Sequence, residues 1–299
     1  MEETKEKGLI DFYMQHHKKW IVVPLIVFVA AIFIIASEYR TTGDIMQKDI
    51  SLKGGITATV YTEQSVDTDG LQAVLQERFG EANVRRLAEF GTNKQIGIIV
   101  EVTSVDEAVV KEVIQSVVEM QLTDENYSVE LVGSSLGQEF YRQMMKALVF
   151  AFVLMAVAVF VLFRKIVICT NVVLAALFDI VITIAVVDLL GIKISAAGIA
   201  AFLMLIGYSI DTDMLLATRV MKRREGIISE RVSGAIKTGL TMTATTVAAL
   251  IVGLLIAESL VLKQVFTIIL IGLLVDVVVT YMMNGPMIIM HQVKKETVK

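Results

Sequence analysis

Six long apolar runs constrain the fold of this chain more than any other feature of its sequence. A helix needs about 20 mainly apolar residues to cross the hydrocarbon core of a bilayer. Runs of this kind lie at residues 20–37, 147–163, 166–190, 195–217, 238–257 and 265–290. Of all residues, 55% are hydrophobic and 19% are charged, which is more apolar than a soluble domain requires. The chain is therefore predicted to be a polytopic α-helical membrane protein with six transmembrane helices.

The distribution of Lys and Arg indicates how these helices are oriented, because short cytoplasmic loops carry an excess of both. If the amino terminus is inside, the short outer loops hold only Lys193 and Lys263. The inner segments then hold Lys5, Lys7, Lys18, Lys19, Arg164, Lys165, Arg219, Lys222, Arg223, Arg224, Arg231, Lys237, Lys294, Lys295 and Lys299. We expect both termini, 1–19 and 291–299, to be cytoplasmic and the polar segment 38–146 to lie outside the cytoplasmic membrane. The basic stretch "RVMKRREGIISER" either only sets this topology or also contacts acidic membrane lipids.

The outer segment 38–146 is predicted to form one small domain between helices 1 and 2. Its patterns indicate, in order, an extended stretch at 50–62, a helix at 70–80, strands at 82–90 and 94–103, a helix at 104–120 and a strand at 127–133. This βαββαβ order is that of a ferredoxin-like α+β domain. Ser104 and Glu107 have the spacing of a capping box at the second helix. Residues 136–146 are expected to continue as a helix into the second span.

Four carboxylates lie inside the predicted spans: Asp179 in the third, Asp211 and Asp213 in the fourth, and Asp276 in the sixth. Insertion scales put an Asp at the centre of a membrane helix at about 2.5–3.5 kcal/mol. A carboxylate that changes its charge in such a setting can carry a proton, and hydrogen bonding from helix to helix is the structural alternative. Asp188, near the outer end of its span, is expected to be a solvated interfacial charge.

A polar stripe runs along the fifth span, where Lys237, Thr241 and Thr245 recur at intervals of four residues. Asp211 lies at a similar depth to Lys237, so the two are candidates for a pair. Helix packing alone also selects small hydroxylated residues, which is the alternative explanation of the two threonines. Asp211 and Asp213 point in nearly opposite directions on a helix, and which of them faces a polar neighbour stays open.

Gly54 and Gly55 lie where the first outer strand connects to the membrane region. One interpretation is a hinge that lets the outer domain move. A β-bulge or a close backbone contact is the other.

Composition excludes further classes of function. A net charge of −4 without a broad basic face argues against nucleic-acid binding. The single cysteine, Cys169, and the three histidines, His16, His17 and His291, do not have the spacing of metal ligands. We expect neither a metal nor a cofactor.

Four motifs carry a resemblance to a known family: "SLKGG" at 51–55, "FDIVITIAVVDLLG" from Phe178, "IGYSIDTDMLLATRVMKRRE" from Ile206 and "KTGLTMTATT" from Lys237. With its order of one span, an outer domain and five further spans, the chain resembles the SecF family of protein-export membrane proteins, in particular its archaeal branch. The resemblance implies an accessory subunit, not an enzyme, that joins SecD in a unit related to the resistance-nodulation-division (RND) transporters. It also implies late action on a translocating polypeptide beside the SecY/SecE channel, driven by the proton gradient.

The family pattern also bears on the candidate residues. Its proton site is an Asp of the fourth span, whose SecF position falls on Thr212 here and whose SecD position falls on Asp211. The Arg that the family carries early in the fifth span matches Lys237 within one residue. The third-span His of the family is Phe178 here. The resemblance thus favours Asp211 as the proton site, and the further candidates are Asp213, Asp179 and Lys237.

Three other functions fit parts of the pattern. A scaffold or assembly factor of the translocon needs no energy coupling, so Asp211→Asn would leave it intact. Half of an RND-type exporter of small molecules or lipids needs a cleft for which the outer segment leaves little room. An intramembrane aspartyl protease would use paired Asp residues in Tyr-Asp and Gly-x-Gly-Asp motifs. The sequence has no Tyr-Asp, and its one Gly-Asp, at Gly43 and Asp44, lies outside the spans.

Overall fold

The computed structural model describes residue 10 and residues 12–88, 95–104, 106–221, 226–257 and 259–297. Six helical segments in this part of the chain are long and apolar enough to cross a membrane, as predicted. They are formed by α2 (His17–Trp20) with α3 (Val22–Thr42), α7 (Ser134–Phe163), α8 (Ile166–Leu189), α9 (Ala196–Met221), α10 (Ile228–Ile256), and α11 (Leu260–Val279) with η1 (Thr280–Asn284) and α12 (Gly285–Thr297). The helix expected at 136–146 is the first part of α7.

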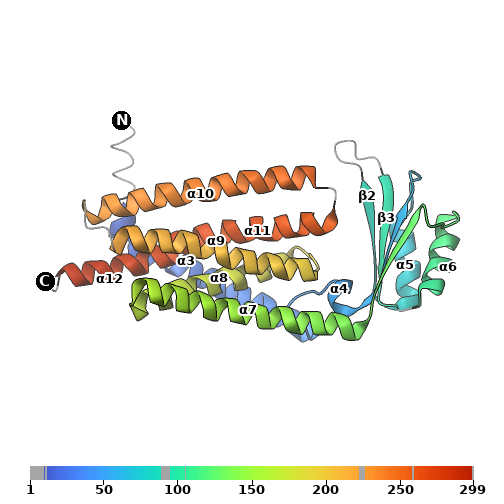
Figure 1. Ribbon diagram of the computed structural model, residues 1–299, viewed down its shortest axis with the longest axis horizontal. Coiled ribbons are helices and arrows are strands. Elements are labelled where there is room, and N and C mark those ends of the chain that lie inside the picture. The colour runs from blue at the N-terminus through green and yellow to red at the C-terminus, as the bar shows by residue number, and fades with distance from the viewer. Residues whose placement is uncertain are drawn as a thin grey trace.

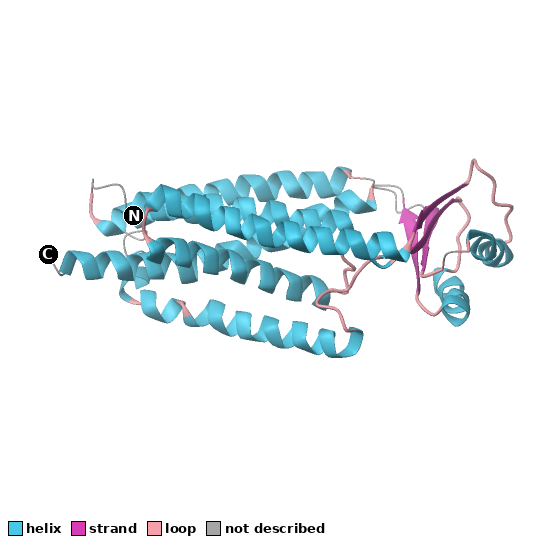
Figure 2. Ribbon diagram, turned by 60° about the horizontal axis from the view of Figure 1, so that its bottom comes forward, coloured by secondary structure: helices cyan, strands magenta, loops and turns pink. Residues whose placement is uncertain are grey.

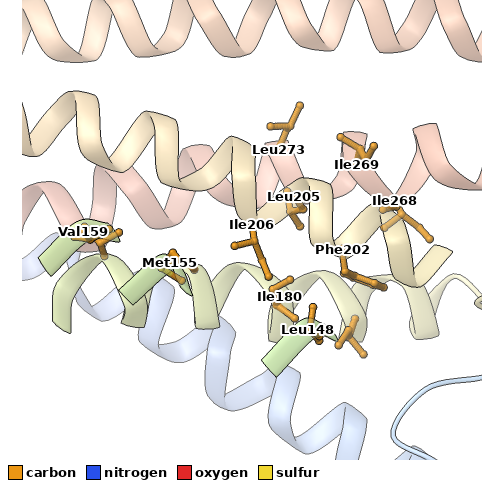
Figure 3. Packing of buried hydrophobic residues seen from close by; sticks show 14 of the residues in the cluster. Leu148, Met155, Val159, Ile180, Phe202, Leu205, Ile206, Ile268, Ile269 and Leu273 are labelled. Atoms are coloured by element: carbon orange, nitrogen blue, oxygen red, sulfur yellow. The ribbon is translucent and has the colours of Figure 1, made fainter. Parts of the chain in front are cut away.

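Helices α8, α9 and α11 form the interior of the bundle. The most apolar stretch of α8 is 67% buried and that of α9 is 50% buried, against 11% for the first span and 17% for α10. Side chains of the three interior helices belong to one buried apolar cluster, and the part here called the apolar layer is Ile180, Phe202, Leu205, Ile206, Ile268, Ile269 and Leu273 (Figure 3). The outer helices α3, α7 and α10 expose large apolar side chains, which suits contact with lipid tails.

A four-stranded antiparallel sheet stands at one end of the bundle, here called the sheet end (Figure 1 and Figure 2). The strand order is β2-β3-β1-β4, with bounds β1 (Gly55–Tyr61), β2 (Ala82–Ala88), β3 (Gln95–Val102) and β4 (Tyr127–Val132). Helices α5 (Thr68–Phe79) and α6 (Glu107–Val118) lie on the side of the sheet away from the bundle. Ile56, Ala58 and Val60 alternate along β1 into a core with these helices. The opposite face of the sheet is turned toward the bundle.

Two local predictions in this domain are wrong, and in both an aspartate caps a helix. Residues 50–53, expected to be extended, form the short helix α4 (Ile50–Lys53), because the Asp49 carboxylate accepts from Ile50 N at 2.7 Å. The start of α6 is not capped by Ser104 and Glu107. Asp106 is its N-cap and accepts from two backbone N–H groups of the first turn.

Glycines allow α4 to pass directly against the start of α7. A Cβ on Gly137 would lie 2.9 Å from the carbonyl carbon of Leu52, and one on Gly54 would lie 2.3 Å from Ser134 Cα. Gly54 also has a φ of +89°, which favours glycine. Gly55 begins β1, where a Cβ would lie 2.4 Å from a backbone oxygen of β3. This geometry is that of a close backbone contact, and the hinge role of Gly54 and Gly55 stays a prediction.

Substitution of Gly137 tests this close approach. Alanine is the better helix former by about 1 kcal/mol, so it would stabilise α7 if the contact were absent. Because the added methyl group would meet the backbone of Leu52, we expect Gly137→Ala instead to lower the free energy of unfolding by about 1–3 kcal/mol. Thermal unfolding of the purified protein measures the difference. Gly133→Ala is the matched control, since nothing lies within 4 Å of a Cβ there. A Gly137→Ala protein as stable as the parent would contradict the contact.

A second joint ties the sheet domain to the bundle through residues 47–51. Ile194, in the loop between α8 and α9, donates its N–H to Gln47 O at 2.6 Å and accepts from Asp49 N at 3.0 Å. Gln47 N donates to Asp188 Oδ1 at 3.2 Å. Asp188 is only 5% exposed. The expectation of a solvated interfacial charge is therefore wrong, because the base of the sheet domain covers the end of α8.

The buried Asp49 carboxyl makes the stability of this region depend on pH. Burial raises the pKa of Asp49 above its ordinary value, and the nearby Glu101 carboxylate adds to the rise. A carboxyl with a raised folded-state pKa contributes stability that is fully present below its unfolded-state pKa and is lost as the pH rises through the folded-state pKa. We expect Asp49→Asn, which keeps a capping oxygen, to be more stable than the parent at neutral pH and to lose this advantage in acid. Unfolding measured across pH checks this. A parent that is the more stable protein at neutral pH would contradict it.

Candidate functional site

Three carboxylates, one from each interior helix, meet inside the bundle. Asp179 comes from α8, Asp213 from α9 and Asp276 from α11, and the exposed fraction of each is 0%. Asp276 interacts electrostatically with both of the others. These three residues are called the carboxylate cluster below. Asp213 is thus the inward-facing member of the pair that the sequence left open.

Asp179 is held by a hydroxyl group of α9. Ser209 Oγ donates to Asp179 Oδ2 at 2.6 Å, and both side chains are buried. Phe178, at the position where the resemblance predicts a histidine, stacks on Phe28 of α3 with ring centroids 3.8 Å apart. A serine of the neighbouring helix is therefore the partner of Asp179.

A π-helical turn brings two further polar groups to the cluster. In η1 the Gly285 N–H donates to Thr280 O, five residues back, and such turns are rare and frequent at functional sites. Thr280 Oγ1 lies 2.9 Å from Asp213 Oδ1 and 3.1 Å from Asp276 Oδ1. Asn284 Nδ2 donates to Asp213 Oδ1 at 2.7 Å. The last span thus presents a carboxylate, a hydroxyl and an amide to α9.

Among the described residues, no ion pair balances the charge of the cluster. The salt bridges found between described residues join other side chains, namely Lys48 with Asp44, Lys53 with Glu81, Arg85 with Glu101 and Arg142 with Glu139. One oxygen of each cluster carboxyl is buried without a hydrogen-bond partner in this part of the chain: Asp179 Oδ1, Asp213 Oδ2 and Asp276 Oδ2. Three unpaired charges so close together in an apolar interior would cost far more than protonation does. The cluster is therefore chemically suited to hold and release protons.

The polar stripe predicted from sequence lies elsewhere. Asp211, Lys237, Thr241 and Thr245 are all exposed on the surface of the single chain. The hydroxyls of Thr241 and Thr245 donate to carbonyls of their own helix at 2.8 Å. The structure brings Asp179 and Asp213 together but leaves these four residues outside the cluster, and their roles stay predictions.

Sequence reasoning does not identify Ser209, Thr280 and Asn284, although a signal for them exists. Asp276, Thr280 and Asn284 recur at intervals of four residues, and so do Ser209 and Asp213. This is the same rule that picks out the exposed stripe. The spacing finds polar faces but does not say which of them is turned inward.

The structure describes residues 219–221 and 226–231 of the basic stretch. Arg219 Nη1 donates to Gly234 O at 2.7 Å, and Arg231 Nη1 donates to Val220 O at 3.0 Å, so both arginines tie α9 to α10. Lys222, Arg223 and Arg224 lie outside the described residues, as do Lys5, Lys7 and Lys299.

Removal of one hydroxyl tests whether the cluster is held as described. Ser209→Ala deletes the donor to Asp179 Oδ2, so a buried carboxyl loses its partner, and we expect the free energy of unfolding to fall by about 1–3 kcal/mol. Thr241→Val is the matched control, because its hydroxyl is exposed and bonds only its own helix. The control should stay within about 0.5 kcal/mol of the parent. Equal melting temperatures for both variants would argue against the Ser209 contact.

Comparison with known proteins identifies related sequences. Residues 110–294 match the model of a family described as "Protein export membrane protein SecD/SecF, C-terminal". The chain is 35% identical over 290 residues to the protein-export membrane protein SecF of Methanothermobacter thermautotrophicus, and the match covers 95% of both chains. It is 33% identical over 280 residues to SecF of Pyrococcus furiosus, covering 93% of this chain and 92% of the relative.

Solved structures show the same fold. The crystal structure of SecDF from Thermus thermophilus, described as a translocon-associated membrane protein, matches 94% of this chain with a TM-score of 0.73 and 21% identity. A SecDF structure in a "super-membrane-facing form" matches with a TM-score of 0.62 and 19% identity. This chain spans only 38% of the first SecDF chain.

Proposed function

Because the chain belongs to the SecF family of protein-export membrane proteins, we propose that it is an accessory, non-enzymatic subunit that joins SecD and acts beside the SecY/SecE channel. Its task is to aid late steps in the movement of an exported polypeptide across the cytoplasmic membrane. The proton gradient supplies the energy. One observation carries the energy coupling: the carboxylate cluster is buried in the spans without an ion pair among the described residues.

The SecD partner covers the exposed polar face of α9 and α10. Asp211, Lys237, Thr241 and Thr245 are costly in contact with lipid, since membrane helices normally turn such groups toward protein or water. In complex with SecD they line a seam between the two subunits. The single chain matches less than half of the SecDF chain, which supports a second subunit of comparable size.

The outer domain, residues 38–146, is ferredoxin-like and extracytoplasmic in this proposal. The strand order β2-β3-β1-β4 with two helices on one face supports the fold assignment. Six spans place both termini on one side, and the excess of Lys and Arg there supports a cytoplasmic location for both. In agreement, α12 reaches the end of the bundle opposite the sheet (Figure 1).

Changes at the cluster reach the outer domain through the ends of the same three helices. Asp188, in the last turn of α8, accepts from Gln47 N. α9 begins beside Ser51, whose Oγ accepts from Ala196 N at 3.3 Å. Gln264, near the start of α11, bonds to the loop between α8 and α9. Protonation that shifts α8, α9 or α11 therefore moves the base of the domain, with Gly54 and Gly55 as hinge candidates.

The client polypeptide contacts the domain on its bundle-facing side. A cavity of about 550 Å³ lies there between the sheet and the loops at the sheet end. Its lining mixes hydroxyl groups with both signs of charge, including Thr57, Arg85, Glu101, Lys193 and Lys263. Such a lining suits the varied sequences of exported chains better than one uniform ligand.

Two isosteric substitutions on α9 test the function. We expect Asp213→Asn to block completion of secretory-protein export in cells whose only copy carries it, because the cluster then loses a carboxyl that changes its charge. Asp211→Asn, two residues away, is the matched control and should leave most export intact. For each variant, co-purification with SecD must first confirm an assembled complex.

The outcomes separate the alternatives. Lost export in Asp211→Asn with normal export in Asp213→Asn would move the proton site to the SecD-facing seam. Normal export in both would favour a scaffold or assembly factor that uses no proton gradient.

A further inference from the structure

Thr280 stands between two carboxyl groups of the cluster. Its Oγ1 lies 2.9 Å from Asp213 Oδ1 and 3.1 Å from Asp276 Oδ1, and all three side chains are fully buried. Both separations are hydrogen-bond distances between oxygens. A threonine hydroxyl has one hydrogen to donate and lone pairs to accept with. It can therefore donate to only one of the two carboxyls at a time.

Counting hydrogens shows that at least one carboxyl of this pair carries a proton. If both carboxyls were ionised, one of the two contacts would set a hydroxyl lone pair against a negatively charged oxygen, without a hydrogen between them. If one carboxyl carries a proton, it donates to Thr280 Oγ1 and the hydroxyl hydrogen goes to the other carboxylate. Both contacts are then hydrogen bonds. Two carboxyls that share a site commonly ionise one at a time for the same electrostatic reason.

We propose that Thr280 is a proton relay that holds Asp213 and Asp276 as a pair sharing one proton. In the transfer, the proton on Asp276 Oδ1 bonds to Thr280 Oγ1 while the hydroxyl hydrogen of Thr280 moves to Asp213 Oδ1. Thr280 keeps one hydrogen throughout, Asp276 becomes the carboxylate and Asp213 the acid. The reverse transfer restores the first state. The pair thus moves a proton between α11 and α9 without water.

Asp276 has polar neighbours besides Thr280, namely Asp179, Ser209 and Thr212. Asp179 approaches from α8 and is bonded to Ser209. Asn284 donates to Asp213 Oδ1, the oxygen that Thr280 also approaches.

Tyr281 of η1 itself interacts electrostatically with Asp276 and Asp213. One tyrosine and one histidine lie on other elements around η1. The Tyr13 hydroxyl, just before α2, donates to Tyr281 O at 2.6 Å, and His17 of α2 bonds to the Met14 carbonyl. Neither group bonds to Thr280.

The spacing of four residues accounts for the bridging position. Thr280 lies one helical turn after Asp276 on the same face of the last span, and this face is turned toward α9. The hydroxyl therefore reaches both Asp276 of its own span and Asp213 of α9, and the π-helical turn that begins at Thr280 brings Asn284 to Asp213 as well. The inference rests on the proposed function, because a relay matters only if the cluster carries protons for export.

Two matched variants test the relay. Thr280→Val keeps the shape of the side chain and removes the hydroxyl, whereas Thr280→Ser keeps the hydroxyl. Infrared difference spectra of the purified protein with SecD in lipid vesicles, titrated over pH, report protonated carboxyl groups directly. We expect the parent and Thr280→Ser to share one carboxylic-acid signal that Asp213→Asn and Asp276→Asn each alter. Thr280→Val should change the position and the titration of this signal and slow export on the order of tenfold or more.

Thr243→Val is the matched control for the loss of a buried threonine hydroxyl, because Thr243 of α10 is buried and is not among the described residues that bond to the cluster. It should keep the shared signal. A Thr280→Val protein with the signal of the parent would overturn the relay, whatever its export activity. An altered signal with normal export would overturn it too. If export is lost in Asp213→Asn but unchanged in Thr280→Val, the proposed function stands and only the relay fails.

Discussion

The burial of three carboxylates without an ion pair between described residues is the constraint on which the rest of the bundle depends. Carboxyl groups removed from water need donors or protons, and both requirements shape the neighbouring chain. Ser209 supplies a donor from one turn before Asp213, and the π-helical turn supplies Thr280 and Asn284. The helices that carry these groups are the most buried ones, and the apolar layer closes over them on the sheet side.

Much of the fold could be predicted because apolar runs and strand alternation are properties of the local sequence. Which face of a membrane helix is turned inward is not a property of the local sequence, since both faces of α9 carry an aspartate. Asp211 and Asp213 differ only in rotation about the helix axis, and the family motif favours Asp211. Contacts with residues far away in the sequence decide which of the two aspartates faces inward. A Cβ on Gly239 of α10 would lie 3.4 Å from Thr212 Cγ2. This close approach turns Thr212 toward α10 and leaves Asp213 inside.

The local errors have two physical causes. A capping box was expected at Ser104, but Asp106 lies nearer to the first N–H groups and caps α6 itself. Residues 50–53 have a pattern compatible with a strand, yet Asp49 and the left-handed Gly54 bound a single helical turn there. Asp188 has the sequence position of an exposed charge and is covered by a segment about 140 residues away in sequence. Competition between nearby capping residues, and burial of a side chain by a segment far away in the sequence, cannot be predicted from a short stretch of sequence.

The apolar layer also has an electrical consequence. Ala196, at the sheet end of α9, and Asp213 are 17 residues apart, which is about 26 Å along a helix axis. Voltage across a membrane falls over dry, apolar matter rather than over water. A charge that passes between the sheet end and the cluster would cross much of this drop, worth up to about 2.3 kcal/mol per elementary charge for each 100 mV. If protons reach the cluster from the sheet end, its proton occupancy responds to membrane voltage even when the pH on the two sides is equal.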